Sequence, residues 1–311
     1  MRPTALAAWE SAVTAAAHVF DRHLVRVRQR RASAIGPANF LLHRVADDLV
    51  DRLDAVIRRF DVAVDLGTPG AAVRDALAAH ARVNTVIAVH PMCAHMPRSG
   101  PAVAAEEEAL PFRNGSLDLV VSALALQLVN DLPGALIQIR RALKPNGLFL
   151  AALLGGDTLT ELRQAFATAE EETTGGISPR VAPFVDVRAL GSLLQRAGFA
   201  LPVTDLDRVT VRYDSPFSLM RDLRRMGGTN PLRSRRRLPL RRATLMRAAD
   251  SYARTFSDED GRIRATFDIV WLSGWAPDES QQKPLKPGAA VTRLADALKT
   301  HEISAGEKTG R

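Results

Sequence analysis

Cysteine, lysine and aromatic residues are scarce in this sequence of 311 residues, and long hydrophobic runs are missing. The single cysteine, Cys93, excludes an internal disulfide framework and fits a reducing compartment. Hydrophobic residues make up 46% of the chain, yet no apolar run approaches the length needed to cross a bilayer. The sequence therefore predicts a soluble globular protein, long enough for one large domain with an insertion.

The shortage of aromatic residues limits how the positive charge can be interpreted. The formal net charge is +8 and the pI is about 10.4, which alone would suggest nucleic-acid binding. Nearly all 42 basic residues are arginine and only 5% of the residues are aromatic, whereas surfaces that stack bases need aromatic side chains beside the charges. The composition therefore favours an acidic protein partner over nucleic acid and leaves contact with an anionic membrane surface open.

Hydrophobic periodicity alternates between strand and helix from residue 39 onward. One apolar face in 39–60 predicts an amphipathic helix, and strand patterns at 61–66 and 85–89 flank a helix at 71–81. This alternation predicts an α/β fold with a parallel sheet covered by helices on both sides. Further expected elements are a strand in 117–126, a helix at 132–143, a turn at 144–147, a strand at 148–153, helices at 157–171 and 186–198, and strands at 205–213 and 261–277.

A helical, arginine-rich segment at about 216–256 interrupts the last strands. Its basic run, RDLRRMGGTNPLRSRRRLPLRR (221–242), has apolar residues between the arginines, which suits a cap that folds over a site. We expect this cap inside a main domain at 39–277. An N-terminal helical segment (1–38) precedes the domain, because residues 1–31 lack the apolar core of a secretory signal, and a flexible polar tail (278–311) follows it.

The stretch DVAVDLGTPGAAV (61–73) resembles the entrance to a cofactor site. An acid and a glycine, Asp65 and Gly67, close a buried strand, where glycines usually follow because their backbone can approach a nucleotide-like ligand closely. Here Pro69, which has no N–H, interrupts the glycines, and Gly70 follows it. The pattern predicts an altered ligand loop, and its alternative is a plain strand-to-helix turn.

The order of elements, with DLG after the first strand and LPFRNGSLDLVVS before the fourth, resembles that of class I S-adenosylmethionine-dependent methyltransferases over residues 40–275. The phrases GGDTLTELR (155–163) and LSGWAP (272–277) are similar to those of bacterial relatives of the mitochondrial complex I assembly factor 5. The resemblance implies a Rossmann-like class I methyltransferase fold, with a mostly parallel seven-stranded sheet and a helical cap insertion.

That family implies hydroxylation of an arginine in an iron–sulfur subunit, its protein client, during assembly of respiratory complex I. It also implies a location in the cytoplasm of a bacterium, or in the mitochondrial matrix of a eukaryote. Two alternatives stay open. The same region is similar to malonyl-acyl-carrier-protein methyltransferases, whose partner is an acyl carrier protein, and a degenerate methyltransferase could serve as a non-catalytic assembly chaperone.

The methyltransferase resemblance also assigns a site for S-adenosyl-L-methionine. Asp65 would take the ammonium group or order its loop, and Leu110 would pack on the adenine ring. The acid that grips both ribose hydroxyls in the family is replaced by His90, and Pro69 and Ala71 replace two family glycines, so two of three anchors are weakened. The predicted cofactor-binding residues are Asp65, Gly67, Gly70, His90, Glu106, Glu107 and Leu110.

Residues that follow the fourth and fifth strands are candidates for a substrate pocket. They are Ser122, Gln127, Gly156 and Asp157, and Asp157 has the alternative role of a helix N-cap. Asp131 is expected to cap the helix at 132–143 rather than to contact a substrate. His90, Cys93 and His95 in HPMCAH suggest a metal, but their spacing is cramped, so we predict no metal site there. The sequence does not identify the catalytic residues or the oxidant of a hydroxylase.

Overall fold

The computed structural model describes residues 18–92, 100–282, 296 and 298–301. The chain divides into two units, Met1–Pro277 and Asp278–Arg311, and the helices and strands named below belong to the first.

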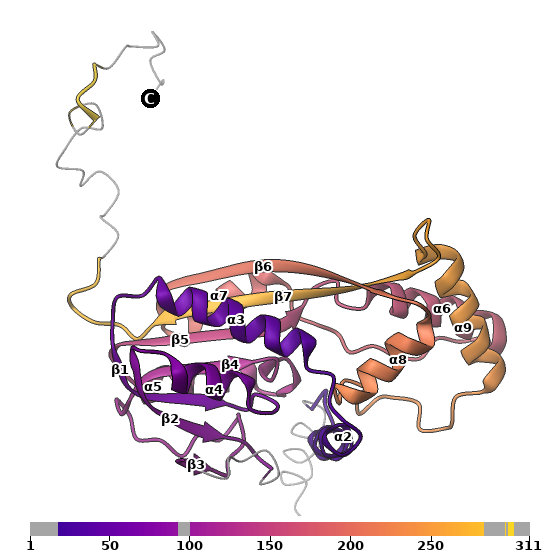
Figure 1. Cartoon of the computed structure of the whole chain (residues 1–311), viewed down its shortest axis with the longest axis horizontal. Helices are drawn as coiled ribbons and strands as arrows, with labels where there is room; N and C mark the ends of the chain where they lie inside the picture. The colour runs from indigo at the N-terminus through magenta and orange to yellow at the C-terminus, as the bar shows by residue number, and fades with distance from the viewer. Residues whose placement is uncertain (1–17, 93–99, 283–295, 297, 302–311) are drawn as a thin grey trace, which may run out of the picture. The chain divides into compact units, whose positions relative to one another are not determined.

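A sheet of seven strands, in the order β3-β2-β1-β4-β5-β7-β6, forms the centre of the first unit (Figure 1). The first five strands pair in parallel, whereas β7 is antiparallel to both of its neighbours. The predicted mostly parallel seven-stranded sheet is therefore confirmed. The strands are β1 (Phe60–Leu66), β2 (Val83–Val89), β3 (Ala102–Val103), β4 (Leu117–Ala123), β5 (Leu143–Gly155), β6 (Ala200–Tyr213) and β7 (Ile263–Trp275).

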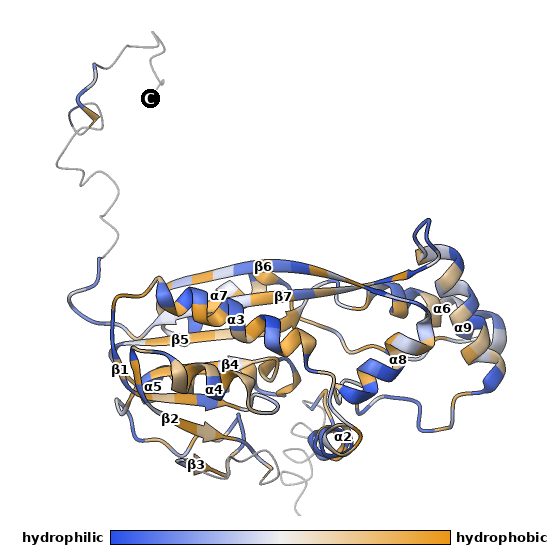
Figure 2. Ribbon diagram, in the orientation of Figure 1, coloured by the Kyte–Doolittle hydropathy of each residue, from blue (hydrophilic) through white to orange (hydrophobic). Residues whose placement is uncertain are grey.

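Helices cover both faces of the sheet, because side chains alternate along each strand. On β1, Val64 and Leu66 pack with the helices α5 (Leu132–Ala142) and α7 (Val187–Ala197), and Ala63 packs with α3 (Phe40–Asp54) and α4 (Ala72–Ala79). Figure 2 shows strands β4 and β5 as hydrophobic along most of their length, as expected for strands buried on both sides.

The third hydrophobic cluster lies beyond one end of the sheet. It joins α6 (Thr160–Thr174), α8 (Pro216–Arg225) and α9 (Arg242–Phe256) to the first half of β7. The predicted helical segment at 216–256 is broken between α8 and α9, because Gly227 has a φ of +71° and prolines at 231 and 239 disfavour helix. We call α8, the 226–241 loop and α9 the cap.

Helix α2 (Arg22–Ala34) is fastened to the cap loop. Phe20 pairs with Leu232 in a β-bridge, the Asp21 amide donates to the Pro231 carbonyl at 2.9 Å, and Arg28 donates to the Thr229 carbonyl at 2.6 Å. Helix α2 and the cap loop therefore meet over 200 residues apart in sequence.

Candidate functional site

A cavity of about 420 Å³ lies at the carboxyl edge of the sheet, between the cap and the loop that follows β1. Pro69 and Gly70 border it from that loop, Gln127 borders it after β4, and Gly227 and Gly228 border it from the cap. The altered ligand loop and the predicted cap therefore face one space. We call this region the cap end of the carboxyl edge.

Gln127 supplies a polar group to this cavity. It belongs to the 3₁₀ helix η2 (Leu126–Leu128), and its Nε2 donates to the Leu124 carbonyl at 2.8 Å. Its Oε1 is buried and has no hydrogen-bond partner among the residues that the structure describes. The same side chain borders two adjoining cavities of about 290 and 270 Å³. Gln127 thus offers one free acceptor to a ligand at the cap end.

The charge that lines the cavity is positive. Arg74 and Arg225 border it, and none of the described residues around it is Asp or Glu. Both arginines have carboxylate partners, Asp75 at 2.8 Å and Asp222 at 3.4 Å. The remaining walls are mostly apolar, from side chains such as Leu124, Leu154, Leu159, Phe184 and Phe267.

The loop after β1 is fixed by its own polar groups. The Ser122 hydroxyl donates to the Leu66 carbonyl at 2.8 Å, and the Ala123 amide donates to the Thr68 hydroxyl at 3.1 Å. Ser122 is fully buried, so its hydroxyl holds the loop and does not border the cavity. Gly67, with a φ of +70°, takes a left-handed conformation that suits glycine.

Asp65 at the end of β1 is buried, and this burial raises its pKa to about 7, although a hydrogen bond with Thr68 acts in the opposite direction. Its Oδ1 has no hydrogen-bond partner within the described chain. A buried carboxyl group with a free oxygen is suited to an incoming cationic group. Asp65 therefore fits the role predicted for it toward an ammonium.

At the other end of the edge, which we call the nucleoside end, the predicted cofactor residues are engaged with the protein itself. His90 is buried, and its Nδ1 accepts from the Met92 amide at 3.1 Å, so this nitrogen is not free for a ribose hydroxyl. The Leu110 amide donates to Gln138 Oε1 at 3.0 Å, and its half-buried side chain packs against the core.

Two arginines of α2 bind the two predicted glutamates. Arg22 Nη2 lies 3.1 Å from Glu106 Oε2, Arg22 also pairs with Glu107, and Arg26 pairs with Glu106. The Glu107 carboxylate covers Gly67, since a Cβ atom on this glycine would lie 2.7 Å from Glu107 Oε1. The absence of a side chain at Gly67 thus allows Glu107 to approach the backbone of the loop closely.

These contacts show which parts of S-adenosylmethionine the site could accommodate. Asp65 and the glycine backbone of the loop fit the amino-acid end of the cofactor. The nucleoside end does not fit in this arrangement, because Glu106 and Glu107 are bound to arginines. Of the seven predicted cofactor residues, Gly70 is the one that borders the cavity.

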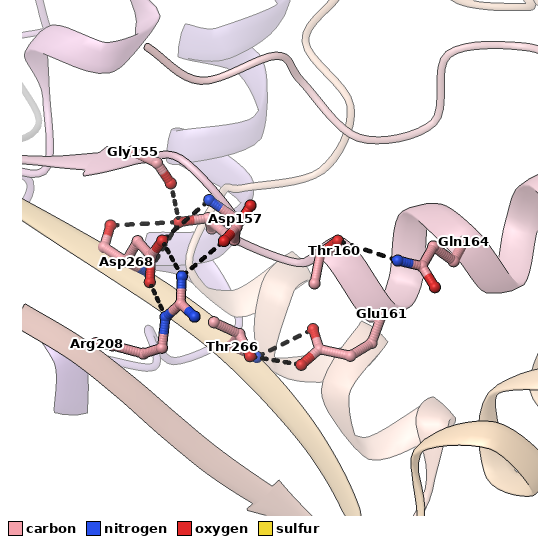
Figure 3. A network of polar contacts seen from close by, with 9 residues as sticks. Gly155, Asp157, Thr160, Glu161, Gln164, Arg208, Thr266 and Asp268 are labelled. Atoms are coloured by element: carbon pink, nitrogen blue, oxygen red, sulfur yellow. Dashed lines mark hydrogen bonds and ion pairs between the residues drawn. The ribbon is translucent and has the colours of Figure 1, made fainter. Parts of the chain in front are cut away.

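Figure 3 shows Asp157 beside Asp268, a buried carboxylate that stabilises the turn after β5; Gly156 precedes Asp157 in the same turn. The Asp157 amide donates to Asp268 Oδ2 at 3.0 Å, and Arg208 binds both Asp268 at 2.7 Å and Asp157 at 2.7 Å. Burial alone would raise the pKa of Asp268, but the hydrogen bonds from Arg208 and the Asp157 amide leave it below its usual range. The turn connects Leu154 to Leu159, which both border the cavity.

The two predicted N-caps have different outcomes. Asp131 caps α5, since its Oδ1 accepts from the Gly134 amide at 2.8 Å. The prediction that Asp157 caps the next helix is wrong, because α6 begins at Thr160 with Leu159 as its N-cap residue. Asp157 is instead held by Arg208, which the local sequence pattern could not indicate.

The metal-like motif is described only in part. Cys93 and His95 lie outside the described residues. Within the ranges that the structure describes, no group of three His, Cys, Asp or Glu side chains is placed to hold a metal ion.

Comparison with known proteins adds family information to this geometry. Residues 64–151 match a family described as "Methyltransferase domain". The chain is 37% identical over 298 residues to "Arginine-hydroxylase NDUFAF5, mitochondrial" of Danio rerio, which covers 93% of this chain and 92% of that protein. It is 38% identical over 194 residues to a malonyl-[acyl-carrier protein] O-methyltransferase of Laribacter hongkongensis, covering 62% of this chain and 63% of that protein.

Among solved structures, the YcgJ protein of Bacillus subtilis matches with a TM-score of 0.52 and 15% sequence identity, covering 76% of this chain and 99% of that one. At this identity the likeness concerns the fold alone. It confirms the predicted Rossmann-like fold of class I methyltransferases.

Proposed function

The chain belongs to the family of the arginine-hydroxylases NDUFAF5, and from this premise we propose that it hydroxylates an arginine of an iron–sulfur subunit during assembly of respiratory complex I. The observation that carries the proposal is the 37% identity over 93% of the chain, which includes the cap as well as the methyltransferase domain. The resemblance to complex I assembly factor 5 that the motif phrases indicated is thereby confirmed.

The apolar walls and the free acceptor of the cap-end cavity support this function, and its two lining arginines are paired with Asp75 and Asp222. An arginine side chain has an aliphatic stem and a planar group of N–H donors, so it needs apolar walls and acceptors at the inner end. The cavity provides apolar walls and the free Oε1 of Gln127. We assign Gln127 to binding of the substrate guanidinium.

The arginines of the cap provide the contact with the protein client. The sequence has no acidic residue between Asp222 and Asp250. Arg233, Arg236 and Arg237 are exposed, and none of them forms an ion pair with the rest of the described chain. Arginine forms bidentate pairs with carboxylates, so an acidic face of the client would bind here.

Charge reversal tests this contact. Substitution of Arg236 and Arg237 by Glu should weaken client binding at least about tenfold at low ionic strength, with a smaller difference in salt. Reversal of Arg58 and Arg59, two exposed arginines between α3 and β1, is the matched control. Equal binding of both variants and the wild type would contradict the assignment.

We also propose a cofactor and a cellular location for the protein. S-adenosyl-L-methionine would bind at the carboxyl edge, with its amino-acid end near Asp65 and Gly70. The protein would act in the cytoplasm of a bacterium or the matrix of a mitochondrion; the Danio rerio relative is named as mitochondrial. In the part of the chain that the structure describes, no helix has the length and hydrophobicity of a membrane span.

The charge of the cavity favours a second candidate, methyl transfer to a malonyl group on an acyl carrier protein. Such a substrate carries a carboxylate, and Arg74 and Arg225 border the cavity without an acidic side chain among the described lining residues. The Laribacter hongkongensis relative carries this activity in its name, but it covers 62% of this chain, compared with 93% for the Danio rerio relative.

Mass spectrometry of the client separates the two functions. The iron–sulfur subunits of complex I are isolated from cells with and without the gene, and their arginine peptides are compared. We expect one arginine to carry an added oxygen atom in the presence of the gene alone. Identical peptides, together with loss of methylated malonyl carrier protein in the deletion strain, would replace the first function by the second.

A further inference from the structure

At the nucleoside end of the carboxyl edge, one arginine side chain bridges the segment that follows β3 and the segment that follows β4. Arg22 reaches Glu106 and Glu107, which follow β3, and its Nη1 donates to the Leu128 carbonyl, after β4, at 3.2 Å. Strand β1 lies between β2 and β4, so the order of strands reverses direction at this point. In open α/β sheets this crevice is where nucleotides bind.

The contacts of Arg22 are the ones that a nucleoside would need. Carboxylates only accept hydrogen bonds, and both the N–H groups of arginine and the amino and hydroxyl groups of a nucleoside donate them. Glu107 is buried, so it needs a donor in either state. One set of acceptors therefore serves either Arg22 or a ligand.

We infer that Arg22, assisted by Arg26, decides whether a nucleoside cofactor binds, because these side chains occupy the nucleoside subsite and must leave it before the ligand enters. The inference rests on the proposal that such a cofactor binds at this edge. The conformation described here is then the closed one, and the apparent affinity for the cofactor is reduced by the fraction of protein that is closed.

The position of α2 links the nucleoside end to the cap end. The same helix contacts the cap loop through Asp21 and Arg28, and Gln29 and Ala32 of α2 border the cavity beneath the cap. A shift of α2 that releases Glu106 and Glu107 therefore also moves one wall of the substrate cavity. Cofactor entry and the shape of that cavity are coupled through one helix.

The opposite hypothesis is that Arg22 is itself a cofactor-binding residue and that α2 closes over the ligand. The two hypotheses predict opposite signs. If Arg22 competes with the cofactor, its removal strengthens binding. If Arg22 contacts the cofactor, its removal weakens binding.

Calorimetric titration with S-adenosyl-L-methionine measures this sign. The test variant replaces Arg22 and Arg26 by Met, which keeps the aliphatic stems and removes the donors. The control variant replaces Arg30 and Arg31 by Met; both are exposed arginines of the same helix that form no ion pair with any described residue. Thermal unfolding of all proteins without ligand verifies that they fold.

We expect Kd of the test variant to be at least about tenfold lower than that of the wild type, or about 1.4 kcal/mol, with no change in the control. If the double variant does not fold, Arg26→Met alone, at a half-exposed position, should give a smaller gain in affinity. Weaker or equal binding by the variants, or no binding by any of the proteins, would overturn the inference. The arginine mass assay is independent of this titration, so the two proposals can fail separately.

Discussion

The cap end and the nucleoside end of the carboxyl edge differ in what faces the strands, although the same parallel strands build both. At the cap end, Pro69, Gly70 and Gln127 border a cavity of about 420 Å³. At the nucleoside end, Glu106 and Glu107 bind arginines of α2. One end of the edge therefore borders a cavity, and the other end is covered by side chains of the protein itself.

The difference shows how the accessible part of the carboxyl edge can change while the sheet stays the same. The sheet fixes where the strands end, and the segments added around it decide which part of the edge remains open. Here those segments are α2 and the cap, which are hydrogen-bonded to each other.

The largest expected effect on stability comes from a substitution that breaks the turn between β5 and α6, which borders the cap end. Substitution of Asp268 by Ala removes the acceptor of Arg208 and of the Asp157 amide, and we expect it to lower the free energy of unfolding by about 3 kcal/mol. Because the pKa of Asp268 is lowered by folding, its contribution is present above its usual pKa and is lost as the pH falls. Urea unfolding at pH 7 and at pH 3 measures both effects.

The matched control for this variant is Asp205→Asn. Asp205 lies in β6, as Arg208 does, and forms an exposed ion pair with Arg52 that this substitution removes. We expect a change within about 0.5 kcal/mol. Similar losses in the two variants would mean that the buried turn has no special importance for the cap end.

A smaller effect concerns Asp65, at the end of β1 between the two ends of the edge. Its pKa rises from 3.8 to about 7 on folding, so the folded protein keeps a proton that the unfolded chain has released. The free energy of unfolding should therefore decrease as the pH rises from about 4 to 7. Asp65→Asn should remove this dependence and be more stable than the wild type at pH 8, by roughly 2 kcal/mol.

Urea unfolding at several pH values between 4 and 8 checks this prediction, with Asp75→Asn, an exposed carboxylate close in sequence, as control. An Asp65→Asn variant that is less stable than the wild type at pH 8 would show that the carboxylate has a cationic partner in the folded protein.

The smallest of these effects on stability, about 1 kcal/mol, is expected for Gln127→Leu, which leaves the Leu124 carbonyl without its donor. Hydroxylation of the client arginine should nevertheless fall at least about tenfold, because the free acceptor of the cap end is lost. Mass spectrometry of the client arginine and thermal unfolding of the same variant separate the loss of activity from the loss of stability. A variant that hydroxylates normally would remove Gln127 from the substrate site.

Much of the sheet, but only two of the residues that border the cavity, Gly70 and Gln127, could be predicted from local patterns. Alternating side chains located β1, and the interrupted glycine loop led to Gly70, which does border the cavity. The arginines and apolar residues of 216–256 indicate a helical segment, but the length of the loop that divides it depends on Gly227 and two prolines together, which the helical pattern alone does not define.

The closed end could not be predicted, because it depends on pairs far apart in the chain. Arg22 and Glu106 are separated by 84 positions, and Arg208 and Asp268 by 60. An arginine on an amphipathic helix carries no local sign of its partner, and the motif that suggested Glu106 as a cofactor ligand is satisfied equally well by an internal ion pair.

Hydrogen exchange of α2 in the wild-type protein, with and without saturating S-adenosyl-L-methionine, tests most directly the claim that this helix closes the nucleoside end. We expect the amides of α2 and of residues 229–233 to exchange faster when the ligand is bound, because Arg22 has been displaced. Slower exchange of α2 at saturation would contradict it, since the helix would then be closing over the cofactor.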